Sequence, residues 1–252
     1  HKLEAEMGSA LFRRERAKTH LTELGRLLYP QFQKLYDETQ HIQNTCDAWQ
    51  KLDTAQLKLG VMCSIAPTKT VTLLRSLRND ISDLELLLSD ATAYELLDKL
   101  ENGEIDCALL ALPDFPEEMV VLPLFKERYV IAFYQGHPFE KEIAVNVNDI
   151  RHYDYMSRLN CESLSYMSSL DINLEGLLNV KYASEREDWI QAMILAGYGI
   201  AIMPEYMKRL DGILSRPLIA PEIYRTVSLV YRAGRQHSPA MKHLINLCGQ
   251  IF

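Results

Sequence analysis

The chain has 252 residues, of which 48% are hydrophobic and 24% are charged, a composition typical of a globular protein with one or two domains. No apolar run reaches the roughly 18 residues that a membrane span needs, and charged side chains occupy the segment where a signal peptide needs an apolar run. We therefore expect a cytoplasmic protein. The five cysteines are scattered and no pair has zinc-ligand spacing, which argues against a disulfide framework and a metal site, and we expect no cofactor.

The net charge of −7 is unevenly distributed, because residues 10–22 carry four basic side chains and one acidic one. An acidic protein with a single basic segment can contact an anion there and almost nowhere else. The alternative is a solvated basic turn without a partner.

Residues 21–52 are predicted to form one long helix with Thr22 as its N-cap. Apolar residues recur at alternating spacings of four and three over three heptads, a narrow seam that favours a partner helix. We expect dimerisation through this seam; the alternative is packing on the chain's own domain. Pro30 lies inside the pattern and predicts a kink or a break. The expected dimer contacts are Leu28, Phe32, Leu35, Ile42 and Trp49.

After Asp53, short apolar strands alternate with amphipathic helices, which predicts an α/β fold with a parallel sheet covered on both faces. Residues 120–134 are extended, too long for one ordinary strand and interrupted by Pro123, and we expect them to carry the chain from one sheet to another. Residues 225–231 are predicted to cross back before a closing helix at 239–251. The other predicted strands are 56–62, 84–88, 105–112, 153–156, 178–182 and 199–203, and the other helices 67–78, 93–101, 161–169 and 186–195.

Two crossings between two α/β halves predict a hinged, two-lobed module that binds its ligand between the lobes. Thr68 lies at a predicted helix start that favours an anion, and Thr92 is a predicted N-cap that either only caps or also contacts the ligand. Arg158 offers a guanidinium, with a surface ion pair to Asp154 or Glu162 as the alternative. These groups favour a small anionic or strongly hydrogen-bonding ligand. The candidate set is Cys63, Ser64, Thr68, Thr92, Arg158, Asn160, Cys161 and Ser184.

Several segments, in this order, resemble the LysR-type transcriptional regulators: LEAEMG at 3–8, LFRR at 11–14, LTELG at 21–25, LGV at 59–61, GEID at 103–106 and AGYGIAIMP at 196–204. The resemblance implies a promoter-binding regulator that forms a homodimer or a dimer of dimers and senses a small effector.

The same resemblance implies the domain organisation. Residues 1–20 correspond to the end of a recognition helix and the wing of a winged helix-turn-helix, whose first thirty to forty residues precede His1 in the family. Residues 21–52 correspond to a linker helix, and 55–252 to an effector domain with a type 2 periplasmic-binding-protein-like fold. Its lobe I is expected at 55–125 and 233–252, and its lobe II at 126–232. The DNA-contacting candidates are Arg14, Arg16, Lys18 and Thr22.

Within this family the chain resembles the peroxide-sensing OxyR branch, because Thr92 matches a polar residue of its peroxide pocket and Cys161 matches its reactive cysteine by position. Leu170 stands where that branch has a resolving cysteine, so an intramolecular disulfide of that kind is not expected. A sulfenate switch at Cys161 is one alternative, since a thiol at a helix N-terminus near Arg158 is expected to ionise readily. The other alternative is a metabolite sensor in which Cys161 only packs.

Two other classes of protein compete with a regulator. An enzyme is not expected, because the common nucleophile, nucleotide-binding and zinc-protease motifs are absent and the seven histidines are dispersed. A solute-binding receptor would share the two-lobed fold, but the wing, the linker helix and the lack of an export signal argue against it.

Overall fold

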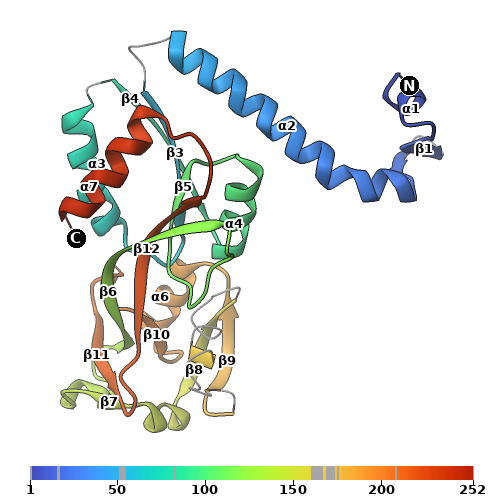
Figure 1. Ribbon diagram of the computed structural model, residues 1–252. Helices are drawn as coiled ribbons and strands as arrows, with labels where there is room; N and C mark the ends of the chain where they lie inside the picture. Colours follow the sequence, from blue (N-terminus) through green and yellow to red (C-terminus); the bar gives the residue numbers. More distant parts are fainter. Residues whose placement is uncertain are drawn as a thin grey trace.

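The structure is a computed structural model that describes residues 2–15, 18–50, 55–81, 83–159, 167–168, 174, 176–207 and 209–251. Figure 1 shows a small amino-terminal unit, one long helix and a two-lobed body. None of the helices in the described ranges combines the length and apolar character that a membrane crossing requires.

The amino-terminal unit consists of α1 (Lys2–Glu6) and a hairpin of β1 (Phe12–Glu15) and β2 (Lys18–Leu21). The Glu4 carboxylate accepts the backbone N–H groups of Leu11 and Phe12 at 2.9 and 3.2 Å, which ties α1 to the hairpin. These two hydrogen bonds lower the pKa of Glu4. The long helix α2 (Glu23–Gln50) starts against the same turn, because a Cβ at Gly25 would lie 2.2 Å from the carbonyl oxygen of Leu11.

Lobe I is built on three parallel strands, β3 (Ala55–Met62) between β4 (Leu84–Ala91) and β5 (Cys107–Leu110). The helices α3 (Pro67–Asp80), α4 (Ala93–Asn102) and α7 (Pro239–Ile251) cover them. Gly60 allows α4 to approach β3 closely, since a Cβ there would lie 2.7 Å from the Leu96 side chain. The buried aliphatic face of α4 explains why this segment is helical and where it packs.

Two long antiparallel strands, β6 (Met119–Tyr134) and β12 (Tyr224–Arg232), connect the lobes. Their register runs from Met119 opposite Arg232 to Arg128 opposite Tyr224 and shifts between Val227 and Ser228. The first part of β6 lies in lobe I, and its last part pairs with β10 (Ala201–Pro204) and β11 (Ile213–Ile219) in lobe II. The two crossing strands therefore form the hinge.

Lobe II completes the eight-stranded sheet with β7 (Val145–Asn146) and adds a separate parallel pair, β8 (Asp154–Arg158) and β9 (Asn179–Ser184). It also holds two 3₁₀ helices, η1 (Pro138–Lys141) and η2 (Val147–His152), and the helix α6 (Glu187–Leu195). Burial lowers the pKa of His137, whose Nδ1 accepts the backbone N–H of Phe139 at 3.1 Å.

The structure corrects three sequence predictions. Residues 119–134 do not pass between two sheets, because β6 belongs to one mixed sheet that spans both lobes. The long helix is continuous through Pro30, so of the predicted kink or break the break does not occur. Strands β7 and β11 were not predicted, since their short or weakly alternating sequences give little periodicity. The helix predicted at 161–169 lies mostly outside the described residues.

Candidate functional site

One hydrogen bond joins the ends of two strands from opposite lobes. Arg158, the last residue of β8, donates from Nη2 to Sγ of Cys63, which follows β3, at 2.7 Å. This contact connects the end of β3 in lobe I with the end of β8 in lobe II. Two residues of the predicted effector set, Cys63 and Arg158, are thus brought together.

Two carboxylates accompany the Arg158 guanidinium. Glu187, at the start of α6, lies 3.8 Å from Arg158, and Asp90, near the end of β4, is close enough for the Arg158 charge to affect it. Burial raises the pKa of Glu187, and hydrogen bonding from Gln191 and the charge of Arg158 oppose this rise. Desolvation likewise raises the pKa of Asp90 against the effect of Arg158. Glu187 is therefore an ion-pair partner of Arg158. Of the predicted alternatives, Asp154 accepts a hydrogen bond from Asn179, and Glu162 lies outside the described residues.

Ser64 is held by a buried arginine that sequence reasoning missed. Arg225, on β12, donates to Oγ and to the carbonyl oxygen of Ser64, both at 2.7 Å. It also donates to Oε1 of Glu127, on β6, at 2.8 and 2.9 Å. The side chains of Arg225 and Glu127 are 0% and 1% exposed, which makes this a buried ion pair at the hinge. No clear signal for this pair was available in the sequence, because Glu127 lies between the charged residues Lys126 and Arg128, and Arg225 lies in a strand with further polar residues.

A second contact between the lobes involves Lys69, in the first turn of α3. Its Nζ lies 4.2 Å from the ring centroid of Tyr206 and 5.6 Å from that of Phe125. The two rings meet edge to face at 6.1 Å. A cation over two rings is a favourable arrangement that holds α3 of lobe I against Tyr206, which follows β10.

The other predicted effector residues have local roles. Thr92 caps α4, because its Oγ1 accepts the N–H of Glu95 at 3.4 Å and the Glu95 carboxylate accepts from Thr92 in return. Ser184 Oγ accepts the N–H of Arg186 at 3.2 Å, and Thr68 is exposed in the first turn of α3. Asn160 and Cys161 lie outside the described residues, so their placement stays a prediction.

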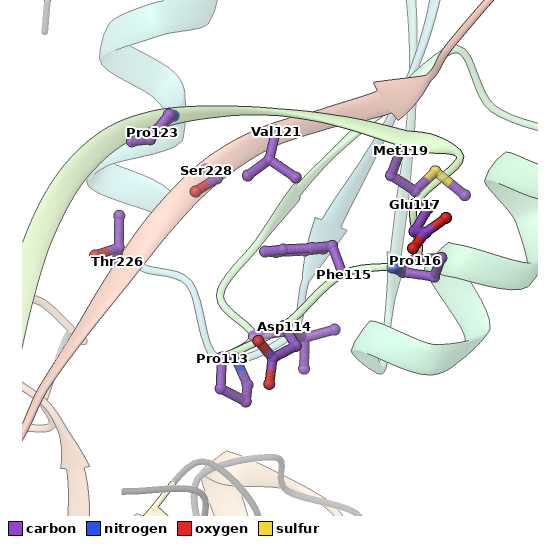
Figure 2. Close-up of a pocket in the computed structure, with 11 residues that line it drawn as sticks. Pro113, Asp114, Phe115, Pro116, Glu117, Met119, Val121, Pro123, Thr226 and Ser228 are labelled. Atoms are coloured by element: carbon purple, nitrogen blue, oxygen red, sulfur yellow. The ribbon is translucent and has the colours of Figure 1, made fainter.

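Figure 2 shows a groove beside the hinge. The side chain of Phe115 extends into this groove from the loop 112–117, next to strands β6 and β12. Its volume is about 520 Å³. Its lining combines apolar side chains with the carboxylates of Asp114 and Glu117 and the hydroxyls of Thr226 and Ser228. No residue of the predicted effector set lines this groove.

The basic segment forms the β1–β2 hairpin. In the backbone register of the hairpin, Arg14 of β1 lies opposite Thr19 of β2, and Glu15 of β1 lies opposite Lys18 of β2. The side chains of Arg14 and Lys18 and the whole of Arg16 lie outside the described residues. Thr22 has a structural role, because its Oγ1 donates to the carbonyl oxygen of Ala10 at 2.8 Å and accepts the N–H of Gly25 at 3.0 Å.

The predicted seam on α2 is largely uncovered in the single chain. Leu35 and Ile42 are 64% and 57% exposed, whereas Leu28 and Phe32 are half-buried. Exposed leucine and isoleucine side chains along one helix face favour a partner surface. The side chain of Trp49 lies outside the described residues.

Comparison with known proteins agrees with this architecture. Residues 50–252 match the family model described as the LysR substrate binding domain. The chain is 27% identical over 242 residues to a hydrogen peroxide-inducible genes activator of Haemophilus influenzae, covering 92% of this chain and 79% of that protein. It is 26% identical to the DNA-binding transcriptional dual regulator OxyR of Escherichia coli, covering 92% and 78%.

The fold also matches solved structures. A full-length OxyR variant from Pseudomonas aeruginosa superposes with a TM-score of 0.71 at 25% identity, covering 99% of this chain and 82% of that one. The family match extends over far more than half of the chain. The chain therefore belongs to the LysR family of transcriptional regulators and carries the family's periplasmic-binding-protein-like effector domain.

Proposed function

We propose that the regulator senses a small anionic or strongly hydrogen-bonding effector that binds Arg158 between the lobes. The observation that carries this proposal is the contact of Arg158 with Cys63 across the cleft. A neutral thiol is a weak acceptor, so a carboxylate or another strong acceptor can replace it at the guanidinium.

The surroundings of Arg158 limit the size and polarity of this effector. Glu187 and Asp90 partly balance the guanidinium charge, so a second acceptor has to approach from the Cys63 side. An effector that binds there replaces a direct contact between the lobes with its own contacts. It thereby favours one relative position of the lobes over another, which is the energetic requirement for a population shift.

A binding measurement tests this assignment. The affinity for sulfate and small carboxylates is measured by calorimetric titration of the wild type and of Arg158→Ala. We expect the affinity of Arg158→Ala to be at least about tenfold lower, since a charge-assisted hydrogen bond contributes about 1.5–3 kcal/mol. Arg151→Ala, an exposed arginine of lobe II, is the matched control. Equal affinities for wild type and Arg158→Ala would exclude Arg158 as the anchor.

We also propose that the hairpin contacts promoter DNA through phosphates while α2 pairs with a second copy. Removing Arg14 and Lys18 together should weaken binding to all sequences alike and reduce the salt dependence by about one unit of log–log slope per lost contact. A loss confined to one promoter sequence, measured by filter binding or fluorescence anisotropy, would contradict the phosphate assignment.

The pairing of α2 with a second copy has its own test. Leu35→Asp and Ile42→Asp should shift the molecular mass in light scattering toward the monomer.

A second candidate is oxidant sensing, which the names of the relatives favour. In this case the Cys161 thiolate attacks one peroxide oxygen, the O–O bond breaks, hydroxide leaves, and the sulfur becomes a sulfenic acid. Stoichiometric peroxide followed by sulfenate trapping and peptide mass spectrometry distinguishes the two candidates. Preferential labelling of Cys161 that depends on Thr92 supports the oxidant sensor. Slow, even labelling of all five cysteines supports the metabolite sensor.

A further inference from the structure

The helix α2 has a second buried face that the dimer seam does not use. Gln33, Asp37, Gln40 and His41 are half-buried and recur at helical spacing, while Leu35 is 64% exposed. At about 100° per residue, Asp37 and Leu35 lie on nearly opposite sides of the helix. A polar face is therefore partly covered, while the seam residues Leu35 and Ile42 are exposed.

The helices α2 and α4 contact each other, and Arg235, which binds the carboxyl end of α4, is close enough to Asp37 and Glu38 of α2 for their charges to affect it. In Figure 1, α2 passes over lobe I on the side of α4. Two guanidinium groups lie at the end of α4: Arg232 and Arg235 both donate to the carbonyl oxygen of Glu101, at 2.7 and 2.9 Å. Gly103 ends α4 in the left-handed region, with φ of 75°, and a Cβ there would lie 3.4 Å from the Arg235 guanidinium. Cations at a helix carboxyl terminus are favourable.

The charges on the two sides are complementary. Oδ2 of Asp37 is buried and has no hydrogen-bond partner among the described residues, so a nearby cation is favourable there. Burial and the charge of Arg232 lower the pKa of Arg235, and the carboxylates of Glu38, Asp37 and Asp106 oppose this. Two of these three carboxylates belong to α2.

We infer that Arg232, Arg235 and the carboxyl end of α4 form a docking seat that holds the acidic face of α2 against lobe I. The seat fits a helix with carboxylates on its polar side, and the occupant is this chain's own α2. Because the seam lies on the other side of the helix, a second copy can pair with α2 while the seat stays occupied.

A charge swap in the full chain tests the seat by hydrogen exchange, without DNA or effector. Arg235→Glu is expected to speed exchange of the amides around Asp37 about two- to fivefold, and Asp37→Arg alone to do the same, as expected for a partly exposed interaction between opposite charges. Combining Asp37→Arg with Arg235→Glu should return the exchange toward the wild-type rate, because opposite charges face each other again. Arg151→Glu, in lobe II, is the control.

Two results would overturn the inference. One is an unchanged exchange rate around Asp37 in Arg235→Glu. The other is a double variant whose fold increase in exchange rate equals the product of the fold increases in the two single variants. Exchange in α7 serves as an internal reference, so that a general loss of folding is recognised. A failure of effector or DNA binding does not affect this measurement.

Discussion

Two arginines lie where the lobes meet, and they are held in opposite ways. Arg225 is 0% exposed and its guanidinium is committed to Ser64 and Glu127. Arg158 is 12% exposed, and its contacts include a thiol at 2.7 Å and a carboxylate at 3.8 Å. A buried charge with matched partners fixes a structure, whereas a charge with a weak acceptor can exchange it for a ligand. The hinge and the proposed effector site of this protein therefore use the same type of side chain in two environments.

The largest effect is expected from breaking the buried pair. Arg225→Met should lower the free energy of unfolding by about 3–5 kcal/mol, because Glu127 is left as a buried charge without its partner. Urea denaturation measures this loss. Adding Glu127→Leu to Arg225→Met should recover most of it, since no unpaired charge then remains. A loss below about 1 kcal/mol in the single variant would show that the hinge does not depend on the pair.

The cap of α4 gives an intermediate effect and separates capping from ligand contact. Thr92→Ala removes the capping box and should cost about 1 kcal/mol of stability, whereas Thr92→Ser keeps it. Thermal unfolding compares the two variants. If Thr92→Ser is as unstable as Thr92→Ala, the capping hydrogen bonds do not stabilise the start of α4.

Arg158→Met should change stability by less than about 1 kcal/mol, because its partners are exchangeable and partly exposed. It should nevertheless increase the radius of gyration in small-angle scattering, since the contact between Arg158 and Cys63 that joins the lobes is lost. A loss of stability as large as that of Arg225→Met would remove the distinction between the two arginines.

The smallest effect concerns pH. Burial raises the pKa of Glu187 above its ordinary 4.5, so the folded protein binds this proton more tightly than the unfolded chain. The resulting stabilisation is complete below about pH 4.5 and is lost as pH rises through the folded pKa. Glu187→Gln should therefore flatten the pH dependence of unfolding above pH 4.5. Asp188→Asn is the control with the opposite sign, because hydrogen bonding from Arg186 lowers the pKa of Asp188.

The strands and helices of lobe I were predictable because their residues carry strong local signals. Apolar runs gave β3 and β4, and the Thr92 and Glu95 pair marks the start of α4 with a capping box. The two crossing strands were also predictable, β6 from its unusual length of 16 residues and β12 from its run of alternating apolar residues. Each of these signals comes from residues that are close together in the sequence.

The contacts across the hinge were not predictable in the same way. Arg225 and Glu127 are 98 residues apart, and only the register of β12 against β6 decides that they meet. The same holds for Cys63 and Arg158, 95 residues apart, which were both proposed as cleft residues but not as partners. Thr22 and Ser64 have polar side chains that suggest a ligand, yet part of their hydrogen bonding serves the fold.

The close approach of Gly25 to Leu11 makes the hairpin and the start of α2 move as one body. From Asp37, at the docking seat, to Glu23 the helix is about 21 Å long at ~1.5 Å per residue. A rotation of only about 10° about the seat would therefore displace the hairpin end of the helix by about 4 Å, close to the ~3.4 Å step between successive base pairs. If the hairpin contacts DNA as proposed, a rearrangement of side-chain size at lobe I becomes a shift of about one base pair there.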